Sequence, residues 1–348
     1  MLPDHVFVIA EIGVNHNGDV KIAEKMIGAA AEAGADAVKF QTFNARRAIS
    51  SVAPKARYQI ANTGNAIESQ QDMVARYELS REDHVALKRV AENLGLIFFS
   101  KPSDLGSADL LESLGVGLYK IGSGDINNLP LIKHVARKNK PIILSTGTAN
   151  IGEVHQALAT IESVSSQDVY LLHCTTEYPC PISDVNLHAM LTLRTTFGKP
   201  VGYSDHTMGI EIPIAAVALG ARIIEKHFTL DCREPGPDHK ASIEPHEFKA
   251  MVQCIRNVEA ALGDGVKRPA KGELANIDVV RRSVVAVHDL RPGTVVTKED
   301  LTIKRPGTGI APADLEKLFG LRLERSVKAD EVLTWDHFKA NEDGRRAR

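Results

Sequence analysis

The sequence predicts an α/β protein built as a (β/α)₈ TIM barrel and followed by a small second domain. Short β-branched runs alternate with segments of helical periodicity along residues 6–263. Regular alternation of this kind is typical of a parallel sheet. Eight such units within ~250 residues favour a closed barrel, and a doubly wound open sheet is the alternative.

The predicted elements follow one another in a simple order. The strands cover residues 6–12, 37–43, 96–100, 118–121, 142–145, 169–174, 201–204 and 222–227. Apolar residues recur at helical spacing over 21–34, 81–95, 107–115, 130–138, 151–161, 187–197, 210–220 and 244–263. Several of these helices stop at glycine, which allows the left-handed turn back toward the sheet. Residues 44–80 begin with a long polar stretch that shows neither pattern.

The character of the chain changes near residue 264. The stretch GDGVKRPAKGELAN is polar and rich in glycine and lysine, as linkers are. We therefore expect a barrel over residues 1–265, a linker over 266–281, a small domain over 282–340 and a disordered tail over 341–348. So small a domain is expected to have little core of its own, and hence to dock on a partner surface.

Composition argues against several functional classes. Lys and Arg number 42 against 44 Asp and Glu, a net charge of −2, so neither nucleic acid nor a membrane is an expected partner. No apolar run is long enough for a transmembrane helix, and the first residues lack the pattern of a signal peptide. Four cysteines are too few for a disulfide scaffold. The sequence thus predicts a cytoplasmic protein with reduced thiols.

Reactive side chains collect where the predicted strands end, which in a (β/α)₈ barrel is the rim of the active site. Lys39 and Gln41 are two residues apart in one strand and therefore share a face. The other candidates at strand ends are Glu11, Lys101, Lys120, Ser123, Asp125, Ser145, Thr176, Tyr178, Ser204, His206, Glu225 and His227. Their concentration at one end predicts a catalytic site there.

Lys39 and Lys120 stand inside otherwise apolar strands. Burying two ammonium groups without anionic partners would be costly. Protein carboxylates such as Glu11 could neutralise one of them, or an anionic ligand could complete the set. Serine hydroxyls and glycine-rich backbone at the same rim suit a phosphate, with the lysines as point charges. The residues therefore predict a small phosphorylated or carboxylated substrate.

His206 and His227 come from adjacent strand ends, so their imidazoles can converge on one divalent metal. Two histidines, completed by water and substrate oxygens, leave the open positions that a catalytic metal site needs. The alternative is that each is a hydrogen-bonded packing residue. The residues alone predict a barrel enzyme but do not name its reaction.

Several strings at these positions resemble the sialic acid (N-acetylneuraminate) synthase family. They are AEIGVNHNG (10–18), KFQTF (39–43), YKIGSGDINNLPLI (119–132), ILSTG (143–147), LHCTTEYP (172–179), GYSDHT (202–207), EKHFTLD (225–231) and GPDHKAS (236–242). The later KRPGTGI (304–310) resembles the C-terminal antifreeze-like (SAF) domain of that family. The resemblance spans nearly the whole chain.

The resemblance implies condensation of phosphoenolpyruvate with an N-acetylhexosamine aldehyde, giving a nine-carbon 2-keto acid and phosphate. It places Mn²⁺ or Mg²⁺ on His206 and His227. Phosphoenolpyruvate would contact Lys39, Lys101, Lys120, Ser123, Ser145, Thr176 and Ser204. The sugar would contact Gln41, Tyr178, Asp238 and Arg305, and catalysis would use the two buried lysines with Glu11 or Asp125 as base. Arg305 would act in the neighbouring subunit of a domain-swapped homodimer.

The chain departs from the family pattern at two site positions. Lys101 stands where many members carry threonine beside the phosphoenolpyruvate carboxylate, so it either adds an ionic contact or points away. Asp125 stands where many members carry glutamate, which shortens the reach of this candidate base by one methylene. The roles of both residues are therefore open.

The sugar is the main open question within the class. Residues 51–73 and the string TTEYP resemble members that use N-acetylmannosamine, and also members that use 2,4-diacetamido-2,4,6-trideoxymannose to make legionaminic acid. We predict N-acetylneuraminate as the product, with N,N'-diacetyllegionaminate as the alternative. A phosphorylated aldose would need a second basic cluster, of which only Arg46 and Arg47 are candidates. A non-catalytic sugar-binding protein would leave the buried lysines and paired histidines unexplained.

Overall fold

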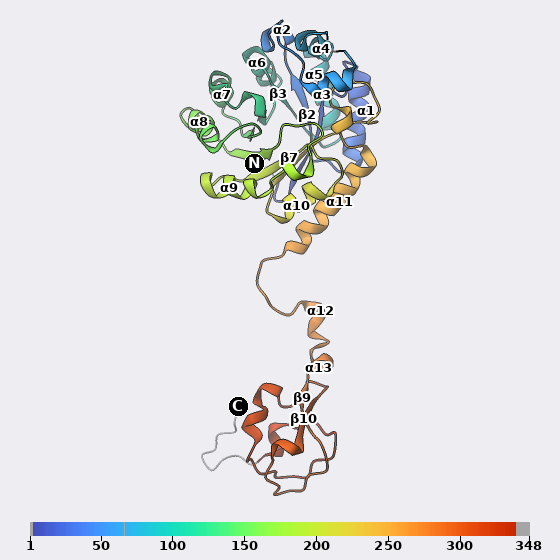
Figure 1. Cartoon of the computed structure of the whole chain (residues 1–348), viewed down its shortest axis with the longest axis vertical. Coiled ribbons are helices and arrows are strands. Elements are labelled where there is room, and N and C mark those ends of the chain that lie inside the picture. Colours follow the sequence, from blue (N-terminus) through green and yellow to red (C-terminus); the bar gives the residue numbers. More distant parts are fainter. Residues whose placement is uncertain (1–2, 66, 339–348) are drawn as a thin grey trace. The chain divides into compact units, whose positions relative to one another are not determined.

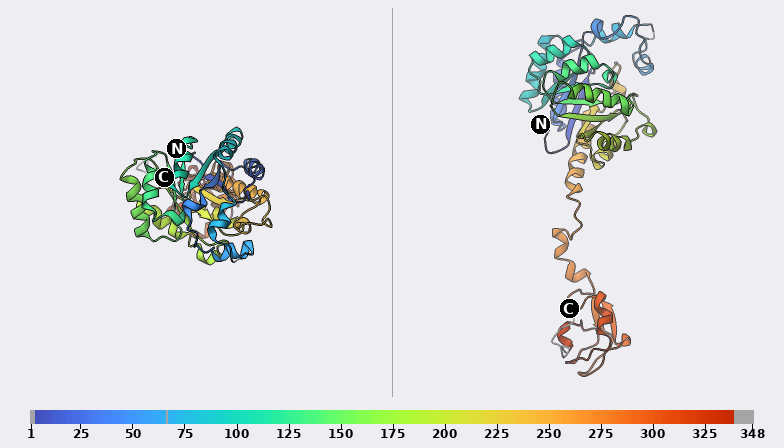
Figure 2. Two further views of the ribbon diagram at one scale, coloured as in Figure 1. Left: turned by 90° about the horizontal axis from the view of Figure 1, so that it is seen from above. Right: turned by 90° about the vertical axis from the view of Figure 1, so that its left-hand side faces the viewer.

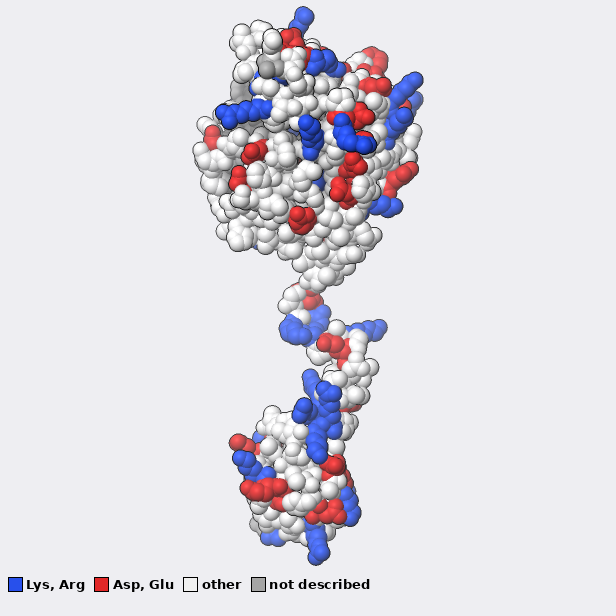
Figure 3. All heavy atoms as spheres, turned by 45° about the vertical axis from the view of Figure 1, so that its right-hand side comes forward, with Lys and Arg blue, Asp and Glu red and all other residues white. Residues whose placement is uncertain are grey.

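The computed structural model describes residues 3–65 and 67–338, so the tail predicted over 341–348 lies outside the described residues. The chain forms two compact units, Met1–Asp264 and Gly265–Arg348 (Figure 1). In the described part, no helix combines the length and the apolar character needed to cross a membrane. On the face of the first unit drawn in Figure 3, acidic and basic side chains are interspersed rather than sorted by sign.

The first unit is a parallel barrel, which confirms the predicted fold. Its strands are β1 (Phe7–Gly13), β2 (Ala37–Thr42), β3 (Ile97–Pro102), β4 (Tyr119–Ile121), β5 (Ile142–Ser145), β6 (Val169–Cys174), β7 (Val201–Asp205) and β8 (Ile223–His227). Hydrogen-bonded neighbours follow the order β3-β2-β1-β8-β7-β6-β5-β4, and β4 packs beside β3 to complete the ring.

Long helices cover the outside of this barrel (Figure 1). They are α1 (Val20–Glu32), α5 (Arg81–Asn93), α6 (Leu105–Ser113), α7 (Leu129–Ala136), α8 (Ile151–Glu162), α9 (His188–Phe197), α10 (Glu211–Ala218) and α11 (Pro245–Leu262). Each coincides with a segment of predicted helical periodicity. Their apolar faces pack on the outward-facing strand residues in one continuous core, which includes Val8, Ala10 and Ile12 of β1.

The segment between β2 and α5 is more structured than its polar sequence indicates. It contains three short helices, α2 (Ala45–Ala48), α3 (Arg57–Thr63) and α4 (Gln70–Ala75). Side-chain caps begin two of them, since Asn44 accepts from the amide of Arg47 and Ser69 accepts from the amide of Asp72. Helices this short carry too few turns for an apolar periodicity to show. In Figure 2 (right) these light-blue helices lie at the end of the barrel remote from the N-terminus.

Inside the barrel, alternate residues of each strand face the axis, and their chemistry changes along the strand. Near the strand starts the inward residues are apolar and form one buried cluster, with Phe7 and Ile9 of β1 and Ile223 of β8 among its members. Further along the same faces come Glu11 of β1 and Glu225 of β8, both buried. Apolar layers therefore fill the barrel near the amino ends of the strands, and ionic groups lie above them near the carboxyl ends.

The second unit contains β9 (Ser283–Ala286) and β10 (Leu301–Lys304), paired antiparallel. The expectation that it has little core of its own is wrong. Buried side chains gather in a cluster separate from that of the barrel: Val284, Ala286, Leu290, Val296, Leu301, Ile310, Leu318, Leu323, Val327, Leu333 and Phe338. The stretch predicted as a linker contains two helical turns, α12 (Lys271–Leu274) and α13 (Ile277–Val280).

Candidate active site

A cavity of about 440 Å³ lies at the carboxyl ends of the barrel strands. Every site residue that the sequence predicts in the barrel lines it: Glu11, Lys39, Gln41, Lys101, Lys120, Ser123, Asp125, Ser145, Thr176, Tyr178, Ser204, His206, His227 and Asp238. The remaining predicted residue, Arg305, belongs to the second unit and is exposed there. Residues far apart in the sequence thus meet because parallel strands end at one edge.

Four buried ionic groups form the floor of this cavity. Lys39 Nζ lies 3.1 Å from Glu11 Oε2 and 3.4 Å from Glu225 Oε2. Lys120 donates to both carboxylate oxygens of Glu225, at 2.7 and 2.9 Å. Ser204 Oγ donates to Glu225 Oε1 over 3.0 Å. The lysines predicted to need anionic partners therefore find them in the protein, and one glutamate serves both.

The two carboxylates of the floor differ in how firmly they hold their charge. Burial alone would raise the pKa of Glu225, but Lys120 and Lys39 together hold it well below its ordinary value. Burial raises the pKa of Glu11, and the charge of Glu225 adds to that shift, while Lys39 opposes it. Glu11 is consequently the carboxylate that gains a proton more easily. With Glu11 protonated, two ammonium groups face one carboxylate, and the floor attracts an anion.

The two lysines also differ in their pKa values. Burial lowers the pKa of Lys120, and the neighbouring charge of Lys39 adds to that effect. Burial acts in the same direction on Lys39, but the charges of Glu11 and Glu225 outweigh it and raise its pKa overall. The difference follows from the contacts, because Lys39 touches two carboxylates and Lys120 touches one.

Glu225 is the central residue to which sequence reasoning gave no role. Its position held a signal, since it stands two residues before His227 and therefore on the same inward face of β8. A carboxylate on that face was a candidate partner for the buried lysines, as Glu11 was. Sequence spacing does not tell which of two carboxylates reaches which lysine.

Small hydroxyl groups form the wall beside the lysines. Ser123, in the 3₁₀ turn η1 (Ser123–Asp125), accepts a hydrogen bond from the amide of Gly147 at 3.0 Å. A side chain at Gly147 would collide with the hydroxyls of Thr176 and Ser123, so glycine is required there. Ser145 Oγ is buried and has no hydrogen-bond partner among the described residues. This wall offers hydroxyl groups, and one of them lacks a partner, as an oxyanion site requires.

His206 and His227 lie next to each other at the cavity, with ring centroids 5.4 Å apart and ring planes tilted by 55°. The ring of Tyr178 packs on both, at 4.1 Å from His206 and 5.5 Å from His227. His206 Nδ1 donates to the carbonyl of Thr175 at 2.6 Å, which leaves Nε2 with the free lone pair of a metal ligand. Burial lowers the pKa of His227, so its imidazole is neutral, and its Nδ1 has no hydrogen-bond partner among the described residues.

This arrangement fits a divalent metal with open positions. The nearest carboxylate is Asp238, whose Oδ2 lies 4.0 Å from His227 Nδ1. Within the described ranges, no cluster of three His, Cys, Asp or Glu residues forms a closed ligand set. Two imidazoles with room for water and substrate oxygens form a site of the catalytic kind.

Lys101 and Asp125 form an ion pair on another side of the cavity. Lys101 Nζ lies 2.8 Å from Asp125 Oδ2 and donates to Ser103 Oγ at 3.0 Å. Its side chain runs over Gly122, where an added Cβ would come within 2.9 Å of Lys101 Cε. Lys101 thus lines the cavity and does not point away from it. Taken together, these groups define an enzyme site for a small anion beside a two-histidine centre.

Comparison with known proteins adds the family to this class. The model of the NeuB family matches residues 26–267, and that of the SAF domain matches residues 281–339. The N,N'-diacetyllegionaminic acid synthase of Campylobacter jejuni is 49% identical over 94% of this chain and 98% of its own length. The enzyme of the same name from Legionella pneumophila is 47% identical over 96% of this chain and 95% of its own length.

Among solved structures, the N-acetylneuraminic acid synthetase of Leptospira borgpetersenii matches with a TM-score of 0.71 and 36% identity. The match covers 79% of this chain and 90% of that one. The chain belongs to the NeuB family and carries a C-terminal SAF domain. It is accordingly a phosphoenolpyruvate-dependent nonulosonic acid synthase, which confirms the predicted enzyme class. The predicted product, N-acetylneuraminate, is supported only at family level, since these relatives favour its alternative.

Proposed function

We propose that this enzyme condenses phosphoenolpyruvate with 2,4-diacetamido-2,4,6-trideoxymannose to give N,N'-diacetyllegionaminate and phosphate. The reaction class is supported by the buried pair Lys39 and Lys120, which meet at the floor of a cavity lined by hydroxyl groups. The choice of sugar is supported by two synthases of that name at 47–49% identity, against 36% for the N-acetylneuraminic acid synthetase. N-acetylmannosamine is the second candidate substrate.

In this proposal the floor binds phosphoenolpyruvate. Lys39 and Lys120 act as point charges for its carboxylate and phosphate, which replace part of their contact with Glu225. Ser123, Ser145 and Thr176 donate to the phosphate oxygens, and the Ser145 hydroxyl is free to do so because it has no partner among the described residues. Lys101 lies at the same cavity and strengthens its attraction for anions.

His206 and His227 would hold Mn²⁺ or Mg²⁺ through ring nitrogens that have no hydrogen-bond partner among the described residues. When bound, such a metal polarises the aldehyde of the sugar as a Lewis acid. Tyr178 fixes the two imidazoles by packing on both, and the Thr175 carbonyl fixes the tautomer of His206. Imidazole nitrogen is a softer donor than the oxygens that Mg²⁺ prefers, so metal titration with each ion decides between them.

The bond changes then balance as follows. The methylene carbon of phosphoenolpyruvate bonds to the aldehyde carbon, and the aldehyde oxygen gains a proton. Water adds to the phosphoenolpyruvate carbon that carries phosphate, giving up a proton, and the bond to phosphate breaks to leave the 2-keto acid. Glu11 and Asp125 are the candidates to accept the proton from water, since both line the cavity. Gln41, Tyr178 and Asp238 surround the sugar.

The homodimer is part of the proposal. Arg305 is exposed on the second unit, where a guanidinium is free to hydrogen-bond a sugar's acetamide carbonyl or hydroxyls. We place it at the cavity of a neighbouring subunit. We also place the enzyme in the cytoplasm, in agreement with its four unpaired cysteines.

Phosphate release from phosphoenolpyruvate tests the function directly. The purified chain is given each aldehyde in turn, with and without EDTA, and the keto acid is identified by mass. The proposal expects the higher kcat/KM with the diacetamido sugar, and loss of turnover in EDTA that Mn²⁺ or Mg²⁺ restores. A higher kcat/KM with N-acetylmannosamine would reinstate N-acetylneuraminate as the product, and turnover unaffected by EDTA would refute the metal.

A further inference from the structure

The three short helices between β2 and α5 build a wall of the cavity to which the proposed reaction assigns no role. Seven lining residues come from residues 48–74: Ala48, Ile49, Tyr58, Gln59, Gln70, Met73 and Val74, and Tyr77 lies two residues after α4. We call this set, together with Phe43 of the preceding loop, the mouth wall. Its chemistry differs from that of the floor, because it has amide and apolar groups where the floor has charges.

The mouth wall is connected to the metal side of the cavity by aromatic packing. The ring of Tyr58 lies 5.0 Å from that of Tyr178, which in turn packs on His206. Asn62 Nδ2 donates to the carbonyl of Pro237 at 2.7 Å, directly before Asp238. The wall therefore begins beside the residues that surround the reacting end of the sugar in the proposed mechanism.

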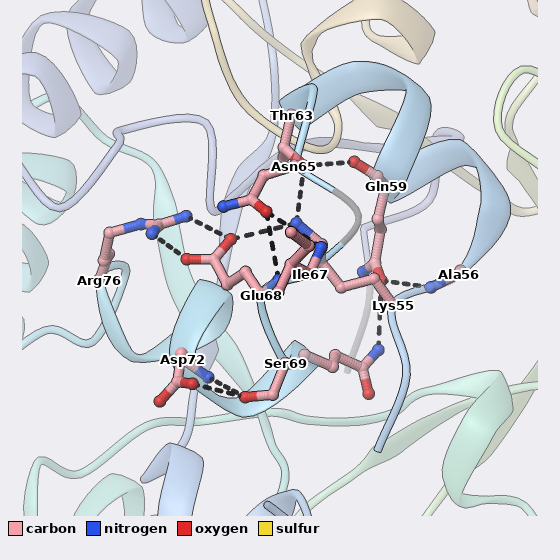
Figure 4. Close-up of polar contacts among 11 residues, drawn as sticks. Lys55, Ala56, Gln59, Thr63, Asn65, Ile67, Glu68, Ser69, Asp72 and Arg76 are labelled. Atoms are coloured by element: carbon pink, nitrogen blue, oxygen red, sulfur yellow. Dashed lines mark hydrogen bonds and ion pairs between the residues drawn. The ribbon is translucent and has the colours of Figure 1, made fainter. Parts of the chain in front are cut away.

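Internal ion pairs hold α3 and α4 together (Figure 4). Lys55 is buried and donates to Thr63 Oγ1 at 3.0 Å and to Glu68 Oε2 at 3.1 Å. Glu68 also binds the guanidinium of Arg76. Because one buried lysine connects the end of α3 to the segment before α4, the lining residues of the two helices keep a fixed spacing.

The lining side chains combine two kinds of group. Met73 is fully buried and packs with Val14, Phe43 and Tyr77, and Val74 packs at the edge of this cluster. Beside it, Gln70 Nε2 donates to Gln59 Oε1 at 3.3 Å, and the same oxygen accepts from the amide of Ala56 at 2.9 Å. An acetamido group matches such a surface, because its methyl needs an apolar contact and its amide needs hydrogen-bond partners.

We propose that the mouth wall is the subsite for the C4–C6 end of the sugar, with half-buried Val74 against the C6 methyl, buried Met73 supporting that apolar contact from behind, and Gln70 against the C4 acetamido group. The assignment rests on the proposed function. The aldehyde carbon must lie near the floor, so carbons 4–6 extend toward the wall. N-acetylmannosamine would place its C6 hydroxyl against the apolar side chain of Val74, and its C4 hydroxyl lacks the carbonyl and methyl of an acetamido group. The wall thereby selects a 6-deoxy sugar with a second acetamido group.

Three sugars separate the parts of this assignment. The compound 2-acetamido-2,6-dideoxymannose differs from N-acetylmannosamine only at C6. The diacetamido sugar, 2,4-diacetamido-2,4,6-trideoxymannose, differs from 2-acetamido-2,6-dideoxymannose only at C4. The methyl ratio is kcat/KM for 2-acetamido-2,6-dideoxymannose divided by kcat/KM for N-acetylmannosamine, and it reports on Met73 and Val74. The acetamido ratio is kcat/KM for 2,4-diacetamido-2,4,6-trideoxymannose divided by kcat/KM for 2-acetamido-2,6-dideoxymannose, and it reports on Gln70. Each ratio cancels any general loss of active enzyme.

Met73→Gln should lower the methyl ratio about tenfold or more, since a polar amide would replace the apolar side chain that supports the contact with the C6 methyl. Val74→Thr, nearly unchanged in shape, should lower it about threefold and decides the matter if Met73→Gln does not fold. Met73→Leu should leave it within twofold. Val90→Thr, on the half-buried face of α5 and outside the cavity, is the matched control. Gln70→Leu should lower the acetamido ratio about tenfold.

The outcomes are distinct for the subsite and for the proposed function. A methyl ratio within twofold of the wild type in the folded Met73 and Val74 variants would overturn the methyl contact. An acetamido ratio unchanged in Gln70→Leu would overturn the acetamido contact. If the wild-type enzyme fails to turn over the diacetamido sugar, the proposed function is wrong, while the methyl ratio still measures the wall. The KM for phosphoenolpyruvate should stay within twofold throughout.

Discussion

Lys101 and Asp125 are 2.8 Å apart, Nζ to Oδ2, and they stand at the two site positions where the family resemblance implies threonine and glutamate. The contact joins the two residues in one ion pair. A lysine in place of a threonine brings a long cation to the cavity, and aspartate in place of glutamate withdraws the opposing carboxylate by one methylene. Gly122 leaves room for the lysine stem.

If the two positions form one unit, their substitutions are coupled. Lys101→Thr leaves the carboxylate of Asp125 without its cation, and Asp125→Glu pushes a longer side chain against Lys101. We expect each single variant to lose about tenfold or more in kcat/KM, and the double variant to recover most of the loss. Steady-state kinetics of the three variants give the coupling, which for contacting residues is roughly 0.5–3 kcal/mol. Additive losses would show that the positions act independently.

The site was predictable from sequence to the extent that strand geometry determines it. Lys39, Lys120 and the two histidines were found because residues at the carboxyl ends of parallel strands converge. The pairing of Glu225 with both lysines was not found, because it depends on side-chain reach across the barrel. The helices α2–α4 were missed for another reason: local capping and the buried Lys55 contacts hold them, and neither leaves a periodic pattern.

A second ion pair connects the strands that carry the histidines. Asp205 precedes His206, Lys226 precedes His227, and the two are register partners across β7 and β8. Lys226 donates to Asp205 and to the carbonyl of Thr207, and all three residues are buried. The ion pair thus connects the carboxyl ends of β7 and β8 on the side opposite to the cavity.

Loss of the ion pair between Asp205 and Lys226 should weaken metal binding. Lys226→Met leaves the Asp205 carboxylate buried without its cation, which costs about 3–5 kcal/mol of folding free energy. In the protein that still folds, we expect Mn²⁺ affinity to fall about tenfold or more, as for other outer contacts of metal ligands. Lys226→Arg keeps the charge and is the control. Calorimetric titration with Mn²⁺ makes the comparison, and equal affinity in folded Lys226→Met and the wild type would contradict it.

The anion floor makes a separate prediction. Lys120→Met removes the cation that donates twice to Glu225, and Lys39→Met removes the cation shared by both glutamates. Truncating one partner of a buried charge pair costs about 2–5 kcal/mol, so phosphoenolpyruvate should bind at least about 30-fold more weakly. The KM of the sugar should change much less. Lys138→Met, outside the cavity and paired with Asp109, is the control. Unchanged phosphoenolpyruvate affinity in both site variants would remove the lysines from the anion site.

Stability in acid should depend on His16. Burial, assisted by the nearby His84, lowers the pKa of His16 from 6.5 to about 4. The unfolded chain takes up this proton near pH 6.5 and the folded chain near pH 4, so the free energy of unfolding falls as the pH drops between these values. For a single such group, the fall is about 1.4 kcal/mol for each pH unit crossed. Urea unfolding at pH 7, 6 and 5 should show a shallower pH dependence in His16→Gln. His155→Gln, exposed on α8, should leave it unchanged. Equal slopes in all three proteins would be the contrary result.

The last prediction concerns Arg305, which directly follows β10 and is exposed on the second unit. If it completes the cavity of a neighbouring subunit, Arg305→Ala should lose sugar affinity while keeping phosphoenolpyruvate affinity, because the lysine floor lies within the barrel. His206→Ala should lose turnover in its own barrel. In a swapped heterodimer of the two variants, one barrel carries both lesions and the other carries none, so mixing the inactive proteins should restore part of the activity. Subunit exchange is verified with differently tagged chains. Exchange without recovery, or full activity of Arg305→Ala alone, would show that Arg305 does not act across subunits.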